Sequence, residues 1–147
     1  MIYEFSYPLT LTPDRHSGGF VVTCADLPEV VTQGQDRAEA LQQAADAIEE
    51  AIAGRIRRGD AIPRPSRPHP RQPVVPVPPV TAAKAALLLA MREAHISQVH
   101  LARLLDCDEK EVRRLLDPRH PSKMPRIQRA LEVLGKRLSL SVMDRVA

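Results

Sequence analysis

The chain has 147 residues, of which 44% are apolar, 27% are charged and 3% are aromatic. That length suits one ordinary domain or two small ones. The sequence contains no run of about 18 apolar residues, so no transmembrane helix is predicted. The first residues lack the basic start and apolar core of a secretory signal. We therefore expect a cytoplasmic protein in which Cys24 and Cys107 are free thiols.

Charge is distributed unevenly along the chain. Residues 1–60 carry 5 Lys and Arg against 10 Asp and Glu, whereas residues 61–147 carry 16 against 8, for an overall net charge of +3. The acidic first part is expected to avoid nucleic acid, and the basic second part is able to approach it.

Residues 1–62 predict strands followed by a helix. Apolar residues from Ile2 to Leu11 indicate a first strand, and Gly18 and Gly19 predict a turn. The β-branched and aromatic segments 20–24 and 30–33 indicate two further strands.

A helix is then predicted from Asp36, which forms a capping box with Glu39, to the terminating Gly59. One apolar stripe is predicted along it, made of Leu41, Ala45, Ile48, Ile52 and Ile56. Residues 1–62 are therefore predicted to fold as a small α+β domain.

Eight of the 14 prolines fall in residues 63–79. Proline fixes φ and removes a donor, so the segment 63–80 is expected to be an extended, semi-rigid linker. A ligand for an SH3 domain is the other interpretation. Residues 74–77 could add an edge strand to the first domain.

Residues 81–147 predict an all-α domain of four helices. Ser97 is expected to cap a helix over 98–105, and Asp108, in a capping box with Glu111, a helix ending at Leu116. The other two helices are expected over 82–93 and from Pro125 to Gly135.

Residues 98–117 fit the twenty-residue helix-turn-helix pattern. Ala102 stands where two helices cross closely, and Asp106 replaces the usual turn glycine, which is tolerable because Asp enters the left-handed region. An ordinary helical hairpin is the alternative. The apolar positions of the pattern are occupied by Leu101, Leu105, Cys107, Val112 and Leu115.

The pattern places the second helix in the DNA major groove, with its outward residues at base edges or phosphates. Since Val112 and Leu115 face inward, four other residues of this helix face outward. Two residues of the first helix are placed to meet the phosphate backbone of the DNA. The candidate DNA-binding residues are Gln98, Arg103, Glu109, Lys110, Arg113 and Arg114.

Useful specificity normally needs two such units on two half-sites, so a homodimer or higher homo-oligomer is expected. The segment 138–142 alternates with period two, as a strand does. It either pairs across a dimer axis or folds back on its own domain.

Taken together, the chain resembles the HicB antitoxins of bacterial type II toxin–antitoxin systems, in their helix-turn-helix variant. Glu29 stands where the family often has glycine, and the helix 109–114 is more charged than usual. The matching segments are 3–9, 19–22, 26–28, 32–34, 38–41, 62–66 and 135–140.

The resemblance implies a first domain with a truncated RNase H-like fold that binds a small HicA-type, mRNA-cleaving toxin. It implies a second domain that represses the operon's own promoter. An acidic first domain would complement a basic toxin. The candidate toxin-binding residues are the acids Asp46, Glu49 and Glu50.

The two rival functions are a nuclease and a stand-alone transcriptional regulator. A nuclease would need carboxylates converging on cations, but Asp14, Asp26, Glu29 and Asp36 all fall in predicted turns, so no catalytic residue is assigned. A stand-alone transcriptional regulator with a ligand-sensing first domain would share every DNA-binding feature. No histidine or cysteine spacing indicates a metal site, and no cofactor is expected.

Overall fold

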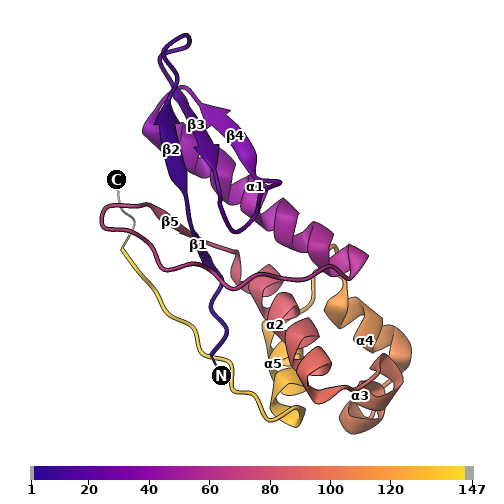
Figure 1. Cartoon of the computed structure of the whole chain (residues 1–147). Coiled ribbons are helices and arrows are strands. Elements are labelled where there is room, and N and C mark those ends of the chain that lie inside the picture. The colour runs from indigo at the N-terminus through magenta and orange to yellow at the C-terminus, as the bar shows by residue number, and fades with distance from the viewer. Residues whose placement is uncertain (1, 145–147) are drawn as a thin grey trace. The chain divides into compact units, whose positions relative to one another are not determined.

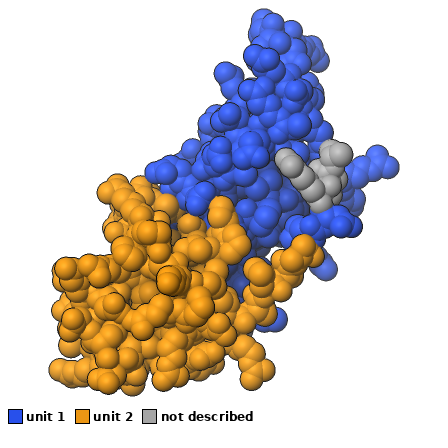
Figure 2. Space-filling view, turned by 180° about the vertical axis from the view of Figure 1, so that it is seen from behind, with its two compact units in different colours: residues 1–52, 63–77, 143–147 blue, residues 53–62, 78–142 orange. Residues whose placement is uncertain are grey.

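The computed structural model describes residues 2–144. The backbone divides into two compact units, drawn in blue and orange in Figure 2. Among the described residues, the first unit comprises residues 2–52, 63–77 and 143–144, and the second comprises residues 53–62 and 78–142. The division falls inside the first helix, because the last turns of that helix group with the helical second unit.

The first unit is built on two small antiparallel sheets. Strands β2 (Thr10–Pro13), β3 (Phe20–Thr23) and β4 (Val31–Gly34) form one sheet in that order, with α1 running along one face (Figure 1). Strands β1 (Ser6–Pro8) and β5 (Val74–Pro76) form the other. The single first strand expected from Ile2 to Leu11 is thus divided at Leu9, because residues 6–8 pair with β5 whereas residues 10–13 pair with β3.

Helix α1 spans Arg37–Arg58 and begins as its sequence predicts. The carboxylate of Asp36 accepts from the N–H of Glu39 at 2.8 Å, and the carboxylate of Glu39 accepts from the N–H of Gln35 at 3.0 Å. Gly59, with φ of +74°, follows its last turn. The start of the helix is therefore fixed by local hydrogen bonds.

The buried stripe of α1 differs from the predicted one in its first two turns. Ala40 and Ala44 are fully buried, whereas the expected Leu41 and Ala45 are half-buried. The cause is a close approach of backbones, since a Cβ on Gly34 would lie 2.6 Å from the Cα of Ala40. At this contact the helix presents Ala40 to the sheet.

Residues 63–77 of the proline-rich segment group with the first unit and are held there by hydrogen bonds. The hydroxyl of Tyr7 donates to the carbonyl of Pro63 at 2.7 Å. The N–H of Ser66 donates to the carboxylate of Asp26 at 2.9 Å, and the Ser66 hydroxyl donates to the same carboxylate. Residues 74–76 form β5, with Val75 opposite Tyr7. Polar groups that proline leaves unpaired locally thus find partners on the first strands and loops.

The second unit contains four further helices, α2 (Pro79–Ala94), α3 (Gln98–Leu105), α4 (Glu109–Leu116) and α5 (Met124–Val133). The hydroxyl of Ser97 accepts from the N–H of His100 at 3.1 Å, as a cap should. Asp106 lies in the left-handed region, with φ of 51° and ψ of 51°, as the helix-turn-helix pattern requires. The side chains that are fully buried here include Leu87, Leu101, Val112 and Ile127.

Three expectations for this part of the chain are corrected. The side chain of Asp108 makes no cap hydrogen bond, and Glu111 instead pairs with Arg126 of α5. Cys107 is half-buried rather than buried. The described residues 138–142 form no strand and so do not fold back as one on their own domain, and Leu140 and Val142 are exposed; pairing across a dimer axis stays a prediction.

Candidate nucleic-acid interface

Helix α4 presents a charged face opposite its buried side. Val112, Leu115 and Leu116 pack inward. Four of the candidate residues, Glu109, Lys110, Arg113 and Arg114, are exposed, as the spacing predicts. A helix of this kind can enter a major groove without uncovering the core.

The two candidates from α3 differ in their surroundings. Gln98, at the first position of α3, lines an open depression of about 350 Å³ together with Arg113 of α4. Arg103 is exposed near the other end of α3 and does not line it. The structure thus brings Gln98 and Arg113 together and leaves Arg103 apart.

Two arginines that sequence reasoning missed line the same depression. Arg57 belongs to the last turns of α1, and Arg119 follows α4. The sequence feature that could have indicated Arg57 is the group of Arg55, Arg57 and Arg58. Basic residues are common in the last turn of any helix, however, because they interact favourably with its dipole. The place of Arg57 beside α4 depends on packing that sequence spacing does not reveal.

Lys84 of α2 is a fully buried charged side chain on a helix whose other buried residues, apart from Thr81, are apolar. Its ammonium donates to the carbonyls of Arg114, Asp117 and His120 at 2.7–2.9 Å and to the Ser122 hydroxyl at 2.8 Å. Burial lowers the pKa of Lys84, and the Asp117 carboxylate partly opposes that shift. Lys84 therefore ties the end of α4 and the loop after it to α2.

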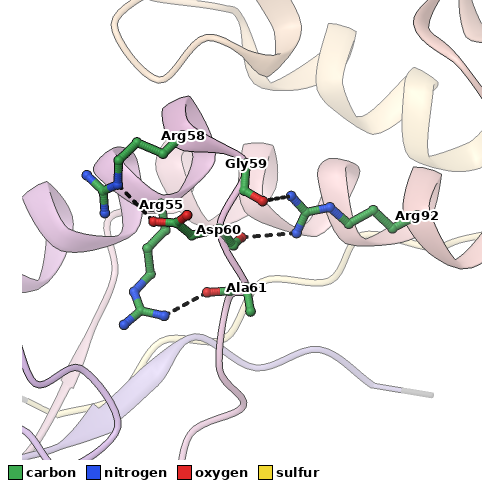
Figure 3. A network of polar contacts seen from close by, with 6 residues as sticks. All are labelled: Arg55, Arg58, Gly59, Asp60, Ala61 and Arg92. Carbon is green, nitrogen blue, oxygen red and sulfur yellow. Dashed lines mark hydrogen bonds and ion pairs between the residues drawn. The ribbon is translucent and has the colours of Figure 1, made fainter.

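The C-terminal end of α1 is held by a second set of contacts, shown in Figure 3. The guanidinium of Arg92, on α2, donates to the carbonyls of Gly59 at 2.9 Å and Asp60 at 3.1 Å. Arg58 pairs with Asp60 at 2.8 Å, and Arg55 donates to the carbonyl of Ala61 at 2.7 Å. These contacts hold the three residues that directly follow the last turn of α1.

The three acids predicted to meet a toxin lie on α1. Asp46 and Glu50 are exposed and Glu49 is half-buried. The amide of Gln42 donates to Asp46 at 3.5 Å. An exposed acidic pair spaced by four residues lies on one face of a helix and is available to a basic partner.

The carboxylates weighed for a nuclease have local structural partners. Asp36 caps α1, and Asp26 holds Ser66. Asp14 accepts from Ser17 at 2.8 Å, and this hydrogen bond holds the pKa of Asp14 below its usual value. Within residues 2–144 no group of three or more His, Cys, Asp or Glu residues is arranged to bind a metal ion. Over the same residues, no helix combines the length and apolar character that spanning a membrane requires.

Comparison with known proteins gives the family. Residues 6–86 match the family described as the HicB-like antitoxin of bacterial toxin–antitoxin systems. Antitoxin HicB of Escherichia coli (strain K12) is 38% identical over 134 residues, which cover 91% of this chain and 96% of that protein.

Two other relatives extend over most of both chains. Antitoxin HicB 1 of Photorhabdus laumondii is 34% identical and covers 97% of this chain and 90% of its own length. Antitoxin HicB of Pseudomonas fluorescens (strain Pf0-1) is 35% identical, with 94% of each chain covered. A match of this extent includes the strands, α1 and the helix-turn-helix alike, and we conclude that the chain belongs to the HicB-like family of antitoxins.

Proposed function

We propose that this antitoxin binds and neutralises a small HicA-type, mRNA-cleaving toxin in the cytoplasm and represses its own operon by binding operator DNA. The observation that supports it best is the exposed, arginine-bearing face of α4 in a chain that belongs to the HicB-like family. Toxin binding is assigned to the first unit and DNA binding to the second.

DNA binding follows from the geometry of α3 and α4. Ser97 and Asp106 set the two ends of α3, so that α4 follows after a tight turn with its buried side against α3. Arg113 and Arg114 are then left on the exposed side, where a guanidinium can bind a guanine edge or a phosphate.

Replacing Arg113 and Arg114 together by alanine is expected to weaken binding to the promoter fragment upstream of the gene by about tenfold to a hundredfold. Both side chains are exposed, so the fold should be preserved. Titration of labelled duplex measures the affinity. Arg129→Ala, at an exposed position of α5, is the matched control.

Unchanged affinity in the double variant would contradict the assignment of α4 to DNA. The same variant should still retain the toxin, because its changes lie outside the first unit. Loss of both activities in a folded variant would contradict the division of labour between the units.

Toxin binding is proposed for the exposed acidic face of α1. Family membership implies a toxin partner, and a protein that binds mRNA is expected to be basic. Acidic side chains would then steer the encounter and select the partner. The stand-alone regulator remains the alternative, because it shares the helix-turn-helix and differs in what the first unit binds.

Capture of proteins from the native host on the tagged full chain, with identification by mass, tests this part. We expect a small basic protein at stoichiometric amount with the wild type. The double charge reversal Asp46→Lys and Glu50→Lys is expected to slow its association about tenfold at low salt, since exposed charges act mainly on the on-rate. Glu132→Lys, on α5, is the control.

Promoter DNA retained without a protein partner would favour the stand-alone regulator and contradict the antitoxin assignment. Equal association of the reversed variant and the wild type would leave a toxin partner in place but remove Asp46 and Glu50 from the interface.

A second copy of the chain is part of the proposal, because one helix-turn-helix reads only a few base pairs. The exposed Leu140, Val142 and Met143 near the end of the described chain are apolar side chains that a partner copy would cover.

A further inference from the structure

The depression beside α4 is lined by three guanidinium groups from three separate segments. Arg57 comes from α1, Arg113 from α4 and Arg119 from the loop between α4 and α5. Gln98, at the N-terminal end of α3, lines it as well. All of these residues belong to the second unit.

One acid shares the depression with the arginines. The carboxylate of Asp117 also lines it, but it accepts from the N–H of Arg119 at 2.9 Å and so is engaged with its own loop. Positive charge therefore predominates, which makes the depression suited to an anion.

Two donors of α2 hold the backbone on either side of the depression. Lys84 donates to the carbonyls of Asp117 and His120, the two residues nearest Pro118 and Arg119 in the loop. Arg92 donates to the carbonyls of Gly59 and Asp60, directly after the last turn of α1. The arginines are thus carried by segments that are already ordered, which lowers the entropic cost of binding.

We propose that Arg57 and Arg119 bind the phosphate backbone of duplex DNA beside α4, so that the DNA interface extends beyond the helix-turn-helix onto α1. This inference rests on the proposed DNA binding. Guanidinium groups bind phosphate oxygens through bidentate, charge-assisted hydrogen bonds. Because the two arginines line the same depression as Gln98 and Arg113, DNA bound by α4 would bring its phosphates within their reach.

The consequence is that α1 takes part in DNA binding, although residues 1–60 carry a net negative charge. Contacts to phosphate carry no sequence information. Arg57 and Arg119 should therefore strengthen binding to operator and unrelated DNA alike, whereas Arg113 and Arg114 contribute to discrimination as well.

The test is the salt dependence of binding by the full chain. The probes are the promoter fragment upstream of the gene and an unrelated duplex of equal length. For Arg57→Ala we expect the slope of the logarithm of the association constant against the logarithm of the salt concentration to become less negative by about 0.9. The affinity should fall roughly threefold to tenfold on both duplexes. Arg119→Ala should behave in the same way.

Two further variants serve as controls. Arg57→Lys keeps the positive charge and should restore the slope, which a purely structural role of the guanidinium would not predict. Arg129→Ala, on an exposed part of α5 outside the depression, should leave the slope unchanged. Unfolding of each variant, followed by circular dichroism, establishes that it is folded.

An unchanged slope in both Arg57→Ala and Arg119→Ala would overturn this inference. If the double variant of Arg113 and Arg114 still weakened binding, the proposed function would stand without it. If that variant also bound normally, the proposed DNA binding itself would fail. A loss confined to the promoter fragment with no change of slope would likewise overturn a phosphate contact.

Discussion

Replacing Lys84 by methionine is expected to lower the free energy of unfolding of the chain by about 2–4 kcal/mol. Methionine has a similar length and fits an apolar helix, so the main change is the loss of the ammonium. Three carbonyl oxygens and the hydroxyl of Ser122 then lose the donor that joins them. Each carbonyl keeps one backbone donor, from the N–H of Asp117, His120 or Ser122, so the cost is the loss of hydrogen bonds to a charged group, which contribute about 1.5–3 kcal/mol each.

A second effect opposes the first, and its size sets the range. Burial disfavours the charged ammonium, as the lowered pKa of Lys84 indicates, so removing the charge recovers part of the loss. The lost hydrogen bonds dominate because four acceptors converge on one nitrogen.

Urea unfolding followed by far-ultraviolet circular dichroism measures the difference. Lys110→Met removes an exposed ammonium of α4 and should change stability by less than about 0.5 kcal/mol. Equal stability of the two variants would contradict the role of Lys84 in tying α4 to α2.

Features fixed by neighbouring residues were predictable from the sequence. The bounds of α3 follow from Ser97 and Asp106, and the start of α1 follows from Asp36 and Glu39. The outward face of α4 followed from the inward spacing of its apolar residues. In each case the signal and the structure lie within one or two turns of the same segment.

Features that join distant segments were not predictable. Ser66 and Asp26 stand 40 residues apart, so no local sequence pattern predicts the hydrogen bond with which they anchor the proline-rich segment. Lys84 is the only charged residue between Thr81 and Met91, but nothing near it in the sequence predicts its acceptors, which lie 30–38 residues further on. Arg57 was assigned to the first domain because proline content, rather than packing, suggested the boundary.

The close approach of β4 and α1 predicts a second large effect. Gly34→Ala is expected to destabilise the chain by about 2–4 kcal/mol, because the added methyl group overlaps backbone atoms of the first turn of α1. A Cβ at this position would lie 2.6 Å from the Cα of Ala40 and 2.8 Å from the carbonyl carbon of Glu39. Backbone cannot move aside as a side-chain end can, so the end of β4 and the start of α1 must separate.

Gly54→Ala is the matched control, because it makes the same chemical change within α1. Its Cβ would meet the guanidinium of Arg58 at 2.8 Å, and that flexible end can move away. Neither glycine has a positive φ, so conformational strain does not distinguish them. Alanine favours a helix interior, so Gly54→Ala should be neutral or stabilise by up to about 1 kcal/mol. The urea concentration at the midpoint of unfolding should therefore fall for Gly34→Ala and should rise or stay the same for Gly54→Ala. A neutral Gly34→Ala would contradict the close contact of β4 with the first turn of α1.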